Sequence, residues 1–114
     1  MIWGEFMRAA IRLTFINNEK KFMGPGTREL LGNIQSFSSI KAASNAMDMS
    51  YSKALHMLRT MEAELGFPVV LSERGGIDRG STTLTQDGER VLRTFQEIET
   101  AVLSYAQALV DEKF

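Results

Sequence analysis

FSSIKAASNAMDMSYSKALHMLRTMEAELG, residues 37–66, is the stretch that decides the fold. Ser38 is a suitable N-cap for one helix and Ser50 for a second, because a serine hydroxyl accepts a hydrogen bond from the free amides of a first turn. Asp48 lies between them at a turn, where aspartate can take the left-handed backbone conformation, and Gly66 ends the second helix. Two helices joined by a turn of three or four residues predict a helix-turn-helix, a motif that places its second helix in a DNA major groove.

The second of these helices, expected over residues 50–65, has one apolar and one polar face. At 100° per residue, Ala54, Leu58, Met61 and Leu65 fall within roughly 40° of one line, which predicts a buried stripe. The opposite face is expected to point outward, and it carries Ser52, Lys53, His56, Arg59, Thr60 and Ala63. The first helix has its own apolar positions at helical spacing, Ile40, Ala43 and Met47.

The segment before this stretch predicts a small hairpin and a helix. Residues 10–16 alternate, with Ile11, Leu13 and Phe15 on one face and Arg12 and Thr14 on the other. That is the period of a half-buried strand. Asn17 and Asn18 favour a turn, after which residues 21–23 can return as a partner strand. Gly24-Pro25-Gly26 then ends the strand, and Thr27 is the expected N-cap of the next helix.

Beyond Gly66 the sequence predicts a second hairpin. Residues 69–74 and 82–84 are rich in β-forming residues, and between them lies the glycine-rich run GGIDRGS, residues 75–81. Two short strands around such a loop make a hairpin. A hairpin in this place is called a wing, and it is expected to present residues 75–82.

A long final helix is expected after Thr85, its N-cap, with about 28 residues and a length of roughly 40 Å. Apolar side chains follow one another along it at spacings of 4, 3, 4, 3 and 4: Val91, Phe95, Ile98, Val102, Tyr105 and Leu109. These spacings are typical of a coiled-coil seam. A second apolar line widens the stripe: Leu92, Leu103, Ala106 and Val110. We therefore expect the six seam residues to form a homodimer interface with the same helix of a second chain.

The expected fold class is α+β, mainly α with small β hairpins: a winged helix-turn-helix with a long C-terminal dimerisation helix. Residues 1–9 are expected to be a frayed lead, residues 10–84 the DNA-binding domain and residues 85–114 the dimerisation helix. At 114 residues there is room for one domain, and the apolar fraction of 44% is ordinary for a globular protein. No run of eighteen or more apolar residues and no export signal is present, so we expect a cytoplasmic protein with no membrane partner.

Charge is distributed unevenly along the chain, although the net charge is only −1. Residues 1–27 carry four basic and two acidic side chains, giving +2; residues 28–84 carry six of each; residues 85–114 carry three basic and six acidic, giving −3. Because phosphate contacts supply most non-specific affinity, we expect weak general DNA binding and a need for two copies on one site.

Residues 38–88 resemble the winged helix-turn-helix of LysR-type regulators, and more closely that of the ModE type, the molybdate-responsive bacterial regulators. The resemblance is carried by Gly24-Pro25-Gly26 ahead of Leu30-Leu31 and Ile34, Ala42-Ala43, Met49-Ser50-Tyr51 followed by Ala54, Met61, Gly75-Gly76 and Leu84-Thr85-Gln86-Asp87-Gly88. The strand-rich lead 11–23 is also like the ModE type. Two departures are Asp48, where the family usually has glycine, and Phe37-Ser38-Ser39-Ile40, where the apolar residue stands one place later. Family members continue into a molybdate-binding module, whereas this sequence stops at Phe114, so the resemblance implies DNA binding and dimerisation without molybdate or other oxyanion sensing.

The expected partner is double-stranded DNA with a two-fold symmetric site, bound by a homodimer. The residues expected to reach bases or their surroundings are Ser50, Tyr51, Ser52, Lys53 and His56, near the start of the recognition helix 50–65. The wing residues expected on phosphates or in the minor groove are Arg74, Arg79, Ser81 and Thr82. Phosphate is also expected at the start of the preceding helix, on Lys41 and the amides of Ser38 and Ser39.

Other functions are less well supported by the sequence. His56, the one histidine, has no carboxylate or serine partner on its helix face, and no nucleophile stands beside a base, so no enzymatic activity is expected. With no cysteine, and with methionines at core spacing, no metal or cofactor is expected. Two alternatives stay open: a protein-interaction module, favoured by the neutral middle of the chain, and a subunit that binds a small anion in the dimer cleft or at the N-terminal hairpin.

Overall fold

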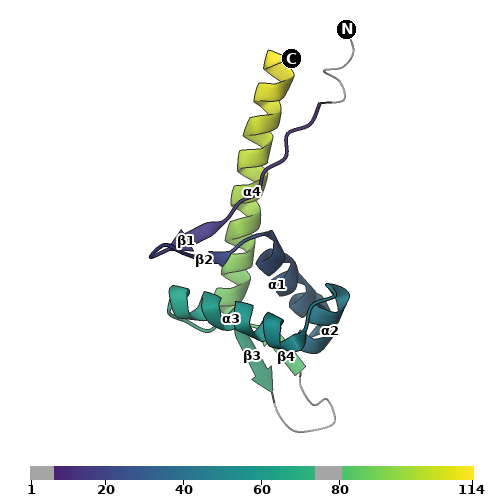
Figure 1. The fold of residues 1–114 in the computed structure, drawn as a ribbon, viewed down its shortest axis with the longest axis vertical. Helices are drawn as coiled ribbons and strands as arrows, with labels where there is room; N and C mark the ends of the chain where they lie inside the picture. Colours follow the sequence, from purple (N-terminus) through teal and green to yellow (C-terminus); the bar gives the residue numbers. More distant parts are fainter. Residues whose placement is uncertain (1–6, 74–80) are drawn as a thin grey trace.

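The computed structural model describes residues 7–73 and 81–114. In these residues the chain is α+β and mainly helical, as predicted, with two small antiparallel hairpins and a long C-terminal helix (Figure 1). The elements in chain order are β1 (Phe15–Asn17), β2 (Lys20–Met23), α1 (Pro25–Phe37), α2 (Ile40–Ala46), α3 (Tyr51–Leu65), β3 (Val70–Glu73), β4 (Ser81–Leu84) and α4 (Gln86–Lys113). The molecule is 62 Å along its longest axis because α4 projects well beyond the body formed by the other elements (Figure 1).

The predicted turn between two helices is confirmed by residues 47–50, which join α2 to α3. Asp48 has a φ of 52°, the left-handed conformation expected there. Ser50 is the N-cap of α3, and its hydroxyl accepts a hydrogen bond from the Lys53 amide at 3.1 Å. The cap of α2 is one residue later than predicted: Ser39 accepts from the Ala42 amide at 3.0 Å, whereas Ser38, with a φ of 55°, ends α1.

Helix α1 begins earlier than predicted, at Pro25. Its N-cap is Gly24 in an extended conformation, and no side chain caps the first turn. A proline at the first helical position has the required φ and lacks the amide that would be free there. Thr27, the predicted cap, lies inside the first turn instead, and its residue is only 8% exposed.

The N-terminal hairpin is shorter than predicted, because only Phe15 and Ile16 of the expected strand 10–16 pair with β2; β1 also includes Asn17, which was expected in the turn. The turn lies one residue later than expected, at Asn18 and Glu19, which both have positive φ values of 50° and 61°. Such values are those of the two-residue turns that match the twist of antiparallel strands. The predicted return strand is confirmed as β2, and residues 7–14 run beside the projecting part of α4 (Figure 1).

The core joins α1, α2, α3 and the first part of α4. The predicted stripe of α3 is confirmed, since Ala54, Leu58 and Met61 are buried, with Leu65 half-buried beside them. They pack with the apolar side chains of the other elements: Met23, Leu30, Leu31, Ile34, Ile40, Ala43, Val69, Leu84, Leu92 and Phe95. Phe95 is 0% exposed and its ring centroid lies 4.9 Å from that of Phe15. This burial corrects the expectation that Phe95 belongs to an interface with a second chain.

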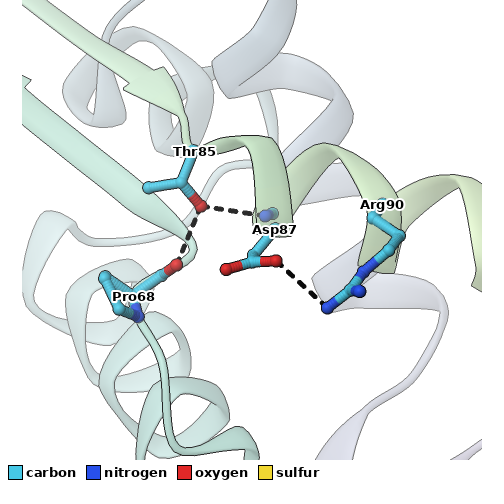
Figure 2. Close-up of polar contacts among 5 residues, drawn as sticks. Pro68, Thr85, Asp87 and Arg90 are labelled. Carbon is cyan, nitrogen blue, oxygen red and sulfur yellow. Dashed lines mark hydrogen bonds and ion pairs between the residues drawn. The ribbon is translucent and has the colours of Figure 1, made fainter.

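The start of α4 is fixed to the segment between α3 and β3. The predicted cap is confirmed: the Thr85 hydroxyl accepts from the Gly88 amide at 2.9 Å and donates to the Pro68 carbonyl at 2.8 Å (Figure 2). Asp87 forms an ion pair with Arg90 at 3.0 Å in the same turn (Figure 2). A Cβ added to Gly88 would stand 2.1 Å from the Val69 carbonyl oxygen, so only glycine permits this close approach.

The projecting part of α4 contacts the N-terminal segment on one side only. Gln107 accepts from the Ala9 amide at 2.8 Å and donates to the Met7 carbonyl at 3.2 Å. Next to it on the helix, Ala106 and Val110 are half-buried. Part of the second apolar line therefore lies beside residues of its own chain, and Met7 and Ala9 of the predicted lead are held in place. The other side of this part of α4 is exposed and apolar: Ile98, Val102, Tyr105 and Leu109.

Candidate nucleic-acid interface

The outward face of α3 is polar and exposed. Its apolar face is fixed in the core, so the opposite face must point to solvent. Of the predicted base-contacting residues, Ser52, Lys53 and His56 lie on this face and are exposed. Ser50, the N-cap, and Tyr51, on the flank of the helix, are exposed at its start. Arg59 and Ala63, farther along, are exposed too, whereas Thr60 is half-buried. The structure thus leaves the whole predicted set exposed, with Ser52, Lys53 and His56 together on the outward face.

This surface carries two basic side chains that form no ion pair with a described residue. Residues 49–61 contain Lys53 and Arg59 and no carboxylate. The ion pairs between described residues are Arg28–Glu99 and Asp87–Arg90, so neither Lys53 nor Arg59 has a carboxylate partner in that part of the chain. A near-neutral body thus presents a locally basic helix face.

The start of α2 adds a second polar surface. Lys41 and Ser38 are exposed. The Ser39 hydroxyl is occupied by the cap of α2, and the Ser38 carbonyl accepts from the Thr82 amide at 2.9 Å. The Ser38 amide donates to the Ile34 carbonyl at 2.8 Å, which corrects the expectation that this amide binds phosphate. Lys41 forms no ion pair with a described residue and remains available to a ligand.

The β3–β4 hairpin supports only part of the predicted wing contacts. Thr82 is 3% exposed and its hydroxyl lies 3.2 Å from that of Ser72, so the expectation that Thr82 contacts DNA is wrong. Ser81, one residue earlier, is half-buried. Arg74 and Arg79, together with the tip 75–80, lie outside the described residues.

Helix α3 is tied at its C-terminal end to the hairpin and to α4. The Glu62 carboxylate accepts from the Val69 amide at 2.8 Å and from the Val70 amide at 3.4 Å. The Val69 carbonyl in turn accepts from the Thr85 amide at 2.9 Å. These contacts fix the direction of the exposed face of α3 relative to both neighbours.

A cleft with a volume of about 370 Å³ lies between the N-terminal hairpin, the start of α1 and α3. Its basic lining residues are Arg12, Lys21 and His56, and no carboxylate lines it. We did not predict Arg12 and Lys21 as site residues. Two features of the sequence could have indicated them: the excess of positive charge in residues 1–27, and the alternation that puts Arg12 and Thr14 opposite the buried face of their segment.

Two further observations concern other kinds of site. In the described parts of the chain, no group of three or more histidine, aspartate or glutamate side chains is arranged to hold a metal ion. No helix in residues 7–73 and 81–114 combines the length and apolar character that crossing a bilayer requires.

Comparison with protein-family models and with curated proteins finds no match to this chain.

Proposed function

We propose that this protein is a sequence-specific, double-stranded-DNA-binding transcriptional regulator without enzymatic activity. In this proposal it is a winged helix-turn-helix protein of the ModE and LysR type, and it acts as a homodimer. The observation that carries the proposal is the exposed first half of α3. Apart from the Ser50 cap, its polar and basic side chains form no hydrogen bond or ion pair with the described residues. The resemblance of residues 38–88 to ModE-type and LysR-type domains supports the same class of protein.

The chemistry of α3 suits base recognition. An α-helix fits the major groove, and side chains near its N-terminus reach the base edges. Lys53 can donate to guanine, Ser52 can donate to or accept from several bases, and the Tyr51 ring can contact a thymine methyl group. Ser50 keeps the first turn helical through its cap, with Ser52 and Lys53 on the outward face and Tyr51 exposed on its flank.

The surfaces beside α3 suit phosphate contacts. Lys41 stands at the start of α2, and Ser81 is the first residue of β4. In the proposed complex these residues, with Arg74 and Arg79, contact the backbone on either side of the groove. Such contacts position the protein and carry no sequence information by themselves.

The exposed side of α4 suits a homodimer. Val102 is 44% exposed and Tyr105 70%, with Ile98 and Leu109 at helical spacing on the same line. In a dimer paired through these residues, two α3 helices enter successive major grooves of a two-fold symmetric site. Two copies also compensate for the weak phosphate attraction of a near-neutral body.

The experiment that tests this proposal is selection of bound duplexes from a random DNA pool, followed by titration of the selected site. Lys53→Ala is expected to weaken binding by about 1–3 kcal/mol, because it removes a base contact. Lys113→Ala, the same change at the far end of α4, is the control and should leave the affinity unchanged. If no sequence is enriched, or if both variants bind like the parent, the proposed recognition surface is wrong.

The neutral middle of the chain favours one rival function, a module that binds a protein partner. The two functions differ in their dependence on salt. Protein binding releases counterions from the DNA phosphates, and added salt opposes that release. DNA affinity therefore falls steeply as the salt concentration rises. Retention on random duplex DNA that decreases with added salt supports the proposed regulator, and absence of any retention at low salt supports the protein-binding module.

A further inference from the structure

The cleft beside α3 has the chemistry of an anion site. Its wall combines residues from three places in the chain: Arg12 and Thr14 before β1, Lys21 on β2, and His56 and Thr60 on α3. Arg12 and Lys21 are exposed, and neither forms an ion pair with a described residue. Because no carboxylate lines the cleft, nothing in its wall offsets this positive charge.

The start of α1 opens into the same cleft. Gly24, Pro25 and Gly26 line it, no side chain caps the helix, and the first turn contains no acidic residue. Among the described residues, no atom accepts a hydrogen bond from the Gly26 or Thr27 amide. Free amides at a helix N-terminus, with the positive end of the helix dipole, attract an anion.

Thr27 provides a second, independent observation. It lines the cleft although its residue is only 8% exposed, and its hydroxyl has no hydrogen-bond partner in residues 7–73 and 81–114. The hydroxyl oxygen is not sealed inside the chain, so a partner can reach it from the cleft. A ligand oxygen in the cleft would supply one for the hydroxyl beside the two free amides.

We infer that this cleft binds a phosphate group, held by Arg12, Lys21 and the start of α1. Phosphate oxygens accept several charge-assisted hydrogen bonds at once, which matches a guanidinium, an ammonium and free amides. The volume of about 370 Å³ exceeds that of a bare ion and falls in the range of small-molecule sites. The rest of a phosphorylated molecule can therefore lie against the apolar wall formed by Phe22 and Met57.

The phosphate has two possible sources, a free phosphorylated small molecule or the DNA backbone. His56 belongs both to the cleft wall and to the exposed face of α3, so the cleft adjoins the proposed DNA surface. Binding of a free phosphate does not depend on the proposed function. The DNA source rests on that function, and for this reason the two sources are tested separately.

The first measurement is a titration of the whole chain with inorganic phosphate, in which binding is monitored through the NMR signals of the Gly26 and Thr27 amides. A titration with sodium chloride at equal ionic strength is the control. We expect saturable shifts with phosphate only. Lys21→Gln should raise the Kd about tenfold, as expected for loss of one charged hydrogen-bond donor. Lys20→Gln, the same change at the neighbouring exposed position that does not line the cleft, is the matched control and should bind like the parent.

The second measurement is duplex DNA affinity in buffer without phosphate. If Lys21→Gln weakens DNA binding more than Lys20→Gln does, the phosphate comes from the backbone. If the two variants bind DNA equally and phosphate saturates the cleft, the ligand is a small molecule. The inference is overturned if the amides show no saturable response and the two variants bind DNA alike, or if Lys20→Gln weakens phosphate binding as much as Lys21→Gln. If the chain shows a saturable phosphate response but binds no DNA, the phosphate site in the cleft is supported and only the proposed function is wrong.

Discussion

The two halves of α4 have the same apolar spacing and different surroundings. In the first half, Leu92 and Phe95 are buried in the body of their own chain. In the second half, Val102 and Tyr105 continue the line of Phe95 and are exposed. A seam at spacings of three and four therefore shows that one side of a helix must be covered, but it does not show which partner covers each part.

The strongest test of this difference is Phe95→Ala. We expect it to lower the free energy of unfolding by about 3–5 kcal/mol, the usual cost of emptying a buried aromatic site. The loss should not depend on protein concentration in chemical denaturation. Tyr105→Ala on the same helix is the control, and any loss it causes should disappear at concentrations where the chain is monomeric. Equal, concentration-dependent losses would mean that both halves face a second chain.

Gly88→Ala tests how closely the first half of α4 is fitted to the body. The added Cβ would stand 2.1 Å from the Val69 carbonyl oxygen, so α4 must move away. We expect a loss of about 3 kcal/mol, at the upper end for overpacking because the obstacle is backbone. Gly32→Ala is the matched control, since a Cβ at that helical glycine meets no atom within 4 Å, and it should stabilise the chain slightly. If the two variants have the same melting temperature, the close approach does not exist in solution.

Val102→Glu tests the second half. If Val102 lies in a homodimer seam, the charge should raise the dimer Kd roughly thirtyfold, corresponding to about 2 kcal/mol, with the monomer still folded. Sedimentation equilibrium over a range of concentrations gives the constant, and circular dichroism reports the fold. Ser104→Glu places the same charge on an exposed position away from the seam and should leave the Kd unchanged. A dimer that tolerates the Val102→Glu change would show that α4 is not the interface.

Gln107→Ala has the smallest expected effect and concerns the side of α4 that its own chain covers. Loss of the contacts with Met7 and Ala9 should cost about 1 kcal/mol. The specific sign is faster hydrogen exchange at the Ala9 amide, which donates to Gln107. Gln96→Ala, an exposed glutamine on the same helix, should not change that exchange rate. Unchanged protection of Ala9 in both variants would mean that other contacts hold the N-terminal segment.

Local signals in the sequence were sufficient for most elements. Ser50 and Thr85 are the caps that were predicted, because each is a single hydroxyl residue directly before a helical pattern. Ser38 and Ser39 stand in tandem, and propensity alone does not choose between them. The choice comes from α1, which continues to Phe37 and ends in the left-handed conformation at Ser38.

The candidate site was predictable where a helix determines it and less so at its edges. The spacing of Ala54, Leu58 and Met61 fixes the outward face of α3, and the exposed residues there agree with it. The burial of Thr82 could have been found as well, because it alternates in phase with Leu84, an apolar residue of the same strand that lies in the core. The cleft could not, since Arg12, Lys21 and Thr27 come together only through the tertiary packing of three elements.

The hydrogen bonds of Val69 have a consequence for the spacing of the half-sites that the proposed dimer would bind. Val69 is bonded both to Glu62 of α3 and to Thr85 at the start of α4, so these two helices change direction together. In the proposed dimer joined through α4, the crossing angle of the two α4 helices would set the distance between the two α3 helices. The spacing of the operator half-sites would then be encoded in a helix that touches no nucleotide.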